Sequence, residues 1–353
     1  MRRDFARESE LTEDWFISLD TSAEPERNAD GSINMHGLLL LSELGLAASD
    51  NSAGARGSVW GQEEAEKASI WVVGDSTVSG FTDSYYIPRE GYGEELSSYL
   101  NADVYNLAIS GTSSKDFTGK ENYTTLLNGD EVKGIPAMGS VADTKQFLVI
   151  GFGHNDEKTE EARYTNPNGN YRTEGSFANS LYTNYVKPAL DAGVTPILCT
   201  PIVRLTDDNT EASYNSASGH ITTTTVINGV TFEGGDYAQA IRNMCSDLGI
   251  DCIDLTKETI ALNVELGEGA QWMHAFTGAK YAEDEVTLIA TGLDKTHTNS
   301  YGAKMNAWLV ANADSALKAY SKGKAKPNYE TDFADAVNPD YVVSDYKSPT
   351  DTS

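Results

Sequence analysis

Cysteine is scarce in this chain of 353 residues. The three cysteines, Cys199, Cys245 and Cys252, are too few for a disulfide framework, and their spacing matches no zinc-binding pattern. Cys199 lies in an apolar run, so we expect a small buried side chain there. Cys245 and Cys252 could pair with each other or remain two free thiols, and the sequence leaves both alternatives open.

Basic residues are also scarce. Lysine and arginine number 26 against 53 acidic residues, which gives a formal net charge of −27. Nucleic acids and anionic membrane surfaces need a basic face, so we exclude both as partners. No apolar run approaches the roughly 18 residues that a membrane-spanning helix requires. The sequence therefore predicts a protein without a membrane span.

The N-terminal part of the chain is polar and shows no hydrophobic signal core. We interpret residues 1–66 as an N-terminal extension or linker, residues 67–322 as a catalytic domain, and residues 323–353 as a C-terminal tail or linker. These ends are consistent with neighbouring modules in a longer chain. We expect an extracellular or cell-surface location, which an acidic protein tolerates, and leave a cytoplasmic location open.

Between residues 69 and 319, short apolar runs alternate with helical patterns. Such alternation predicts a parallel sheet with helices on both faces. The predicted strands are Ile70–Val73, Val104–Ile109, Phe147–Ile150, Val194–Cys199 and Cys252–Leu255. The predicted helices are Gly93–Leu100, Phe177–Ala192 (which Pro188 should bend or break), Tyr237–Leu248 and residues 302–319. Residues 205–235 contain an Asn228-Gly229 turn and are predicted to form a hairpin insertion, whose relation to the site stays open.

The first strand ends in Gly74-Asp75-Ser76. Open α/β sheets place ligands at the carboxyl ends of their strands, and a serine held there is exposed in front of the sheet. Ser76 is therefore a candidate nucleophile, provided that a base lies nearby.

Asp294 and His297 supply the remaining groups of a catalytic triad. On a helical turn, their three-residue spacing would put both side chains on one side. The carboxylate would fix the imidazole tautomer, and the imidazole would take the proton from Ser76. The oxyanion needs donors, for which the backbone N–H groups of Ser76 and Gly111 and the amide of Asn155 are suitable.

These segments resemble the four motif blocks of the SGNH (GDSL-type) hydrolases. They are Gly74–Val78, Gly111, Gly151–Asp156 and Asp294–Ala303. The longer strings are similar to the rhamnogalacturonan acetylesterase branch, whose members remove acetyl groups from pectic polysaccharides. The resemblance covers about residues 69–319. It implies a flavodoxin-like three-layer α/β/α sandwich with a five-stranded parallel sheet, a Ser-His-Asp triad, and no metal or organic cofactor.

Several histidines admit two interpretations. His154 could touch substrate or pack beneath its loop. A metal site built from His154, His297 and Asp294 is conceivable, but a triad already explains two of these residues, so we predict no metal. His220 lies in a polar segment and is expected to face solvent.

Trp272 and His274 precede the last motif block. Aromatic faces stack on sugar rings, so these residues could line a substrate subsite; core packing is the alternative.

The sequence thus favours a carbohydrate O-acetylesterase that acts on acetylated polysaccharide or oligosaccharide. One alternative is a lipid esterase, lysophospholipase or acyl-thioesterase of the same fold; another is a non-catalytic carbohydrate-binding module. Rhamnogalacturonan is polyanionic, and its repulsion from an acidic protein should slow encounter at low salt. A locally neutral cleft, a small oligosaccharide or a neutral polymer such as acetylated xylan would reduce that repulsion.

Overall fold

The structure of the protein, a computed structural model, describes residues 67–82, 89–277, 280–281, 288–289 and 292–328. The predicted N-terminal extension, residues 1–66, and residues 329–353 of the predicted tail lie outside these ranges. The central sheet consists of β1 (Ala68–Gly74), β2 (Ala102–Asn106), β3 (Lys145–Gly151), β4 (Thr195–Cys199) and β7 (Asp251–Ile253).

All five strands are parallel and lie in the order β2-β1-β3-β4-β7. This is the flavodoxin-like order, in which the chain crosses from one side of the first strand to the other. The predicted parallel sheet is confirmed. The switch point of such a sheet lies between its first and third strands, so it falls between β1 and β3.

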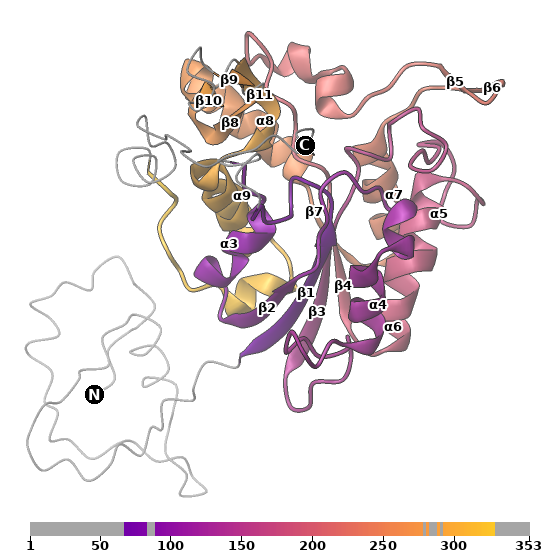
Figure 1. The fold of residues 1–353 in the computed structure, drawn as a ribbon, viewed down its shortest axis with the longest axis vertical. Coiled ribbons are helices and arrows are strands. Elements are labelled where there is room, and N and C mark those ends of the chain that lie inside the picture. Colours follow the sequence, from indigo (N-terminus) through magenta and orange to yellow (C-terminus); the bar gives the residue numbers. More distant parts are fainter. Residues whose placement is uncertain (1–66, 83–88, 278–279, 282–287, 290–291, 329–353) are drawn as a thin grey trace, which may run out of the picture. The chain divides into compact units, whose positions relative to one another are not determined.

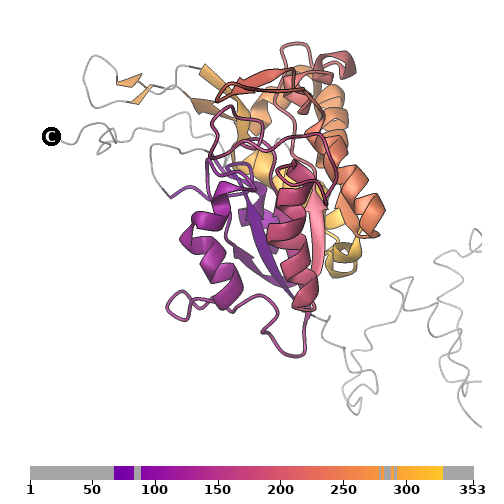
Figure 2. The same ribbon diagram turned by 90° about the vertical axis from the view of Figure 1, so that its right-hand side faces the viewer.

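Helices cover both faces of the sheet (Figures 1 and 2). They are α3 (Tyr92–Tyr99), α4 (Glu121–Asn128), α5 (Phe177–Leu181), α6 (Lys187–Asp191), α7 (Tyr237–Leu248), α8 (Leu255–Leu266) and α9 (Ser300–Asn312). Side chains alternate along β1: Ile70 and Val72 pack toward α3 and α9, whereas Trp71 and Val73 pack toward α4, α5, α6 and α7. Every residue of β1 is buried, which explains the continuous apolar run Ile70–Val73 at its centre.

The predicted helices differ from the observed ones mainly at their ends. The predicted helix 177–192 is divided by a π-helical segment, Tyr182–Val186, just before Pro188 in the first turn of α6. Proline has no N–H to donate, so a disturbed turn before it is expected. The predicted helix 302–319 already ends at Asn312, and a short 3-10 turn follows at Ala316–Tyr320.

Three further strand pairs of the described part of the chain lie outside the central sheet. β5 (Thr225–Ile227) and β6 (Val230–Phe232) form the predicted hairpin, whose Asn228 and Gly229 both have positive φ, as a type I′ turn requires. β8 (His274–Thr277) pairs antiparallel with β11 (Gly292–Thr298), and β9 (Lys280–Tyr281) pairs with β10 (Leu288–Ile289). No helix in the part of the chain that the structure describes is long and apolar enough to cross a membrane.

The cysteines are free thiols. Cys199 is fully buried in β4, as expected. The sequence left open whether Cys245 and Cys252 pair. In the structure, Cys245 on α7 and Cys252 on β7 are both free thiols.

Two glycines face each other where β1 and β3 end. Gly74 pairs with Gly151, and a Cβ at Gly74 would lie 2.6 Å from both the Gly151 carbonyl oxygen and Val78 Cγ2. A Cβ at Gly151 would lie 2.3 Å from the Tyr92 hydroxyl. The absence of side chains here lets Val78 and Tyr92 close over the end of the ladder.

We therefore expect Gly74→Ala to destabilise the protein by about 1–3 kcal/mol, because the new methyl group meets a backbone carbonyl in the sheet. Urea unfolding would measure the change. Gly119→Ala is the matched control: no atom lies within 4 Å of its Cβ position, so its effect should stay within about 0.5 kcal/mol. Equal effects of the two substitutions would contradict this account.

Candidate active site

Ser76 lies on the tight turn that follows β1. The Asp75 carbonyl accepts hydrogen bonds from Val78 N (3.1 Å) and Ser79 N (3.0 Å), and its carboxylate Oδ1 accepts from Thr77 N (2.9 Å) and Thr77 Oγ1 (2.8 Å). Asp75 therefore shapes the turn, as a local Asx interaction does. The sheet and the turn together hold Ser76 at the rim.

A hydrogen-bonded chain joins the three predicted triad residues. His297 Nε2 lies 2.8 Å from Ser76 Oγ, and His297 Nδ1 lies 2.7 Å from Asp294 Oδ2. Because a carboxylate only accepts, Nδ1 carries the proton, and the lone pair of Nε2 faces the serine hydroxyl. Phe81 presents its ring edge-on to His297, with the centroids 6.4 Å apart.

The predicted helical turn at Asp294 and His297 is wrong. Both residues lie in the irregular strand β11, whose pairing with β8 shifts register between Leu293 and Thr298. The Asp294 carboxylate instead folds the segment back on itself, because Oδ1 accepts from Thr296 N (2.9 Å) and His297 N (3.1 Å). A side-chain turn of this kind brings residues three apart together without a helix.

Asp294 is nearly buried, and four donors surround its carboxylate. The fourth donor is Arg89 Nε, 3.0 Å from Oδ2, which our sequence analysis did not find. Burial alone would raise the pKa of Asp294, but the hydrogen bond and charge of His297 outweigh it and lower the pKa to about 2. The carboxylate therefore stays ionised throughout the neutral and mildly acidic range.

The other two motif loops are bonded to the same region. Gly74 O, two residues before Ser76, accepts from Ile109 N (3.0 Å) and Thr112 Oγ1 (3.4 Å), and Thr112 O accepts from Asn155 Nδ2 (3.0 Å). Gly111 has φ of +82°, a conformation that favours glycine. The structure thus brings the Ser76, Gly111 and Asn155 segments to one edge of the sheet.

The loop after β3 is anchored by Asp156. Its carboxylate accepts hydrogen bonds from Ser114 N, Ser114 Oγ and Thr165 Oγ1, and the whole residue is buried. This agrees with the Gly-x-Asn-Asp motif having one residue toward the site and one that holds the loop.

His154 lies beneath the loop rather than on it. It is 2% exposed and packs edge-on against His220, with ring centroids 4.6 Å apart. Burial, together with the charge of Arg204, lowers the pKa of His154 well below its usual value. The sequence allowed His154 either to contact substrate or to pack beneath its loop, and the structure shows it packed beneath the loop.

The expectation that His220 faces solvent is wrong, because it is fully buried. Its Nε2 lies 2.7 Å from Ile202 O, and its Nδ1 lies 3.1 Å from Glu157 Oε1. His154, Glu157 and His220 place their ligand atoms within 4.8 Å of one another, a set that could hold a metal ion. However, Arg204 Nη2 lies 2.6 Å from the same Glu157 oxygen and already supplies positive charge, so we assign no ion here.

The two predicted sugar-contacting residues, Trp272 and His274, differ in their exposure to solvent. His274 is buried, whereas Trp272 is 37% exposed. The Trp272 carbonyl accepts from Asn299 Nδ2 (2.8 Å), and Asn299 caps α9 directly after β11. Trp272 therefore lies beside the segment that carries Asp294 and His297.

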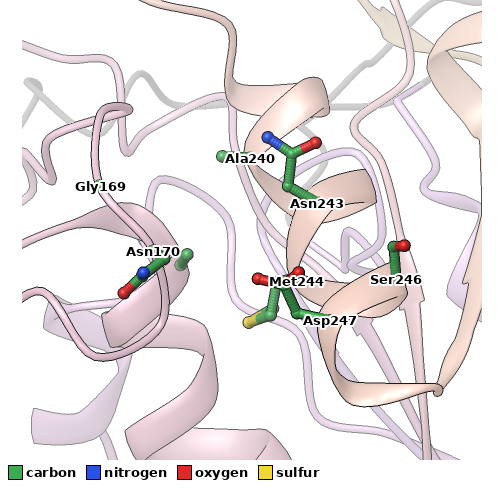
Figure 3. A pocket seen from close by; sticks show the side chains of 8 residues that line it. Gly169, Asn170, Ala240, Asn243, Met244, Ser246 and Asp247 are labelled. Carbon is green, nitrogen blue, oxygen red and sulfur yellow. The ribbon is translucent and has the colours of Figure 1, made fainter.

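Two hollows of the described part of the chain lie away from these motifs. One, of about 390 Å³, lies between the Gly169-Asn170 loop and α7, where Asn243, Met244 and Asp247 line it (Figure 3). A second, of about 450 Å³, adjoins the C-terminal end of α7. Neither is lined by a residue of the four motif blocks.

Asp156 provides a pH-dependent test of this loop. Burial raises its pKa to about 7, although the Ser114 and Thr165 hydrogen bonds favour the charged form. The folded state holds this proton more tightly than the unfolded state does. The protonated carboxyl group therefore adds most to the free energy of unfolding in acid, and this addition declines as the pH rises toward 7. The limiting slope is about 1.4 kcal/mol per pH unit.

As the pH rises from about 5 to about 7, we expect the free energy of unfolding of wild type to fall relative to that of Asp156→Asn. Urea titrations of both proteins across this range would measure it, and asparagine, which does not ionise, isolates the carboxyl group. A difference that stays constant with pH would contradict the raised pKa.

Known proteins resemble the part of the chain that carries the motifs. Residues 70–308 match the family described as GDSL-like Lipase/Acylhydrolase. The chain is 27% identical over 247 residues to the Bacillus subtilis protein named "Probable rhamnogalacturonan acetylesterase YesY", covering 69% of this chain and 90% of that protein. It is 26% identical over 246 residues to "Rhamnogalacturonan acetylesterase RhgT" of Bacillus subtilis, covering 69% and 87%.

Among solved structures, the lipase/acylhydrolase from Enterococcus faecalis is similar with a TM-score of 0.36 and 13% identity, over 73% of this chain and 99% of that one. The family match extends from β1 into α9 and so includes all four motif blocks. The chain belongs to the GDSL-like lipase/acylhydrolase family, the SGNH serine esterases.

Proposed function

We propose that this esterase is a carbohydrate O-acetylesterase, with acetylated rhamnogalacturonan-type pectin as its substrate. The observation that carries the catalytic part is the continuous hydrogen-bonded chain from Asp294 through His297 to Ser76. The acetyl and pectin parts are supported by the names of the two Bacillus subtilis relatives.

Each triad member has a distinct role in the proposed reaction. Ser76 Oγ bonds to the acetyl carbon while His297 Nε2 takes the hydroxyl proton. The tetrahedral intermediate then breaks its bond to the sugar oxygen, which receives that proton and leaves as the free hydroxyl. Water attacks the acetyl-enzyme, His297 takes the water proton, and acetate leaves as the proton returns to Ser76.

The negative oxygen of each intermediate needs donors that are already in place. We assign this role to the N–H groups of Ser76 and Gly111 and to Asn155 Nδ2. In support, the loops that carry them are bonded to one another through Gly74 O and Thr112 O. Such fixed donors need little reorganisation as charge develops.

The groups near the site suit a saccharide. An exposed aromatic side chain can stack on a sugar ring, whereas an acyl lipid would need a deep apolar tunnel. Trp272 exposes 37% of its surface beside the His297 segment and could stack on a sugar ring. Arg89 and Arg163 lie at the site, and their charges offset part of the field of an acidic protein. A polyanionic polymer could therefore approach with less repulsion than the net charge of −27 suggests.

Asp294→Asn tests the orienting carboxylate. Asparagine can donate to Nδ1 and so stabilise the wrong tautomer, and we expect kcat for p-nitrophenyl acetate to fall roughly 10³–10⁴-fold. Since the pKa of Asp294 is about 2, a fall of the wild-type rate on the acid side of its pH–rate profile, at any pH above about 4, should not come from this group. Turnover by Asp294→Asn close to wild type would contradict the proposed role.

The substrate is tested by acetate release. Wild type, Ser76→Ala and Ser79→Ala would be incubated with acetylated rhamnogalacturonan, acetylated xylan and p-nitrophenyl acetate. We expect wild type to release acetate fastest from rhamnogalacturonan, and Ser76→Ala to lose this activity because it lacks the nucleophile. Ser79→Ala makes the same substitution three residues along the turn and should retain it.

Other outcomes would separate the parts of the proposal. Cleavage of p-nitrophenyl acetate but of neither polymer would discard the polysaccharide and favour acyl lipids or thioesters. Faster release from xylan, unaffected by salt, would favour a neutral polymer. Saccharide binding without any hydrolysis or any organophosphonate labelling of Ser76 would contradict the esterase mechanism itself.

A further inference from the structure

Arg163 touches both segments to which we assign oxyanion donors. Its Nη1 donates to Gly111 O (3.2 Å) and to Asn155 Oδ1 (3.2 Å). Its Nη2 donates to Glu160 Oε1 (2.6 Å) at the outer side. One guanidinium therefore joins the loop after β2 to the loop after β3.

The contact with Asn155 decides which way its amide faces. Arginine has only donors, so the oxygen and not the nitrogen of the Asn155 amide must point toward it. Nδ2 then points the other way, where it donates to Thr112 O (3.0 Å). An NH₂ group has a second hydrogen, and this is the one that we assign to the oxyanion.

The loop that carries Arg163 is itself held on three sides. Thr165 Oγ1 donates to the buried Asp156 (2.9 Å), and Tyr164 packs against Phe232 of the β5–β6 hairpin, with ring centroids 4.9 Å apart. Asn228, at the tip of that hairpin, donates to Glu161 (2.6 Å). The insertion therefore supports the loop from which Arg163 reaches the site.

The environment strengthens these bonds. Asn155 is 6% exposed, and the Arg163 side chain is 25% exposed. Hydrogen bonds from a charged donor are stronger than neutral ones, and partial exclusion of water strengthens them further. A positive charge behind Asn155 also polarises its amide in the sense that favours a negative oxygen in front of it.

We propose that Arg163 is the positioning residue of the oxyanion hole, where it fixes the orientation of the Asn155 amide and the position of the Gly111 peptide. This rests on the proposed roles of Asn155 and Gly111. It predicts that Arg163 affects the chemical step mainly through Asn155 and does not contribute to the affinity for an uncharged substrate.

The test is a double-mutant cycle with Arg163→Ala, Asn155→Ala and the double variant, using p-nitrophenyl acetate. We expect Arg163→Ala to lower kcat about 10–100-fold, somewhat less than loss of a donor itself, while KM stays within about threefold. In the Asn155→Ala background, the same substitution should cost less than about threefold, because the Asn155 amide is absent and only the contact with Gly111 O is left to lose.

Two further variants separate positioning from folding and charge. Arg163→Lys keeps the charge but offers a single point of donation, so its kcat should lie between those of wild type and Arg163→Ala. Glu160→Gln is the matched control: it removes the ion-pair partner of Arg163 and leaves both contacts to the hole, so kcat should stay within about twofold. Melting temperatures would verify that every variant is folded.

Each failure has its own meaning. Wild-type kcat in a folded Arg163→Ala variant would overturn the inference, as would an equal loss with and without Asn155. Wild-type kcat in Asn155→Ala would instead contradict the proposed oxyanion role of Asn155.

Discussion

The in-register parallel pairing of β1 with β3 is the constraint on which the rest of the site depends. The ladder runs from Ala68–Lys145 to Gly74–Gly151, so both strands deliver their loops at the same level. The chain leaves β1 toward β2 on one side, while β3 lies on the other, and the loops diverge at this point. The loops that carry Ser76 and Asn155 therefore leave the sheet at the same level, although the two residues are 79 positions apart in the chain.

Arginines hold the acceptor side chains of this site in place. Arg89 contacts Asp294, Arg163 contacts Asn155 and Arg204 contacts Glu157. A guanidinium has donors in a rigid planar fork and no acceptor, so each contact leaves its partner only one orientation. In a chain with a net charge of −27, these three arginines thus order side chains near the motifs and bring positive charge to them.

The sequence-based predictions failed where a contact, and not a local pattern, decides the structure. Helices α4 and α8 were not predicted; α8 begins directly after β7, where Asp254 caps it, and the apolar Leu255 was taken as the end of a strand. Residues near His220 are polar, yet its partners Ile202 and Glu157 bury it. The burial of His220 cannot be derived from periodicity, because Ile202 and Glu157 lie 18 and 63 positions away in the chain. The missed start of α8 is instead a local boundary, since Asp254 caps the helix from the position directly before it.

Apolar runs, their turn residues and four short motifs determined the fold class, the strands of the sheet and the three residues of the proposed triad, because side-chain period and strand-end chemistry are local properties. Only the tertiary structure decided which side chains orient the residues of the proposed site. The carboxylate-built turn that brings Asp294 to His297, and the approach of Arg163 to Gly111 across 52 positions, depend on how the loops pack. The contact of Arg163 with Gly111 depends on how the sheet places two distant loops, so no pattern along the chain can predict it.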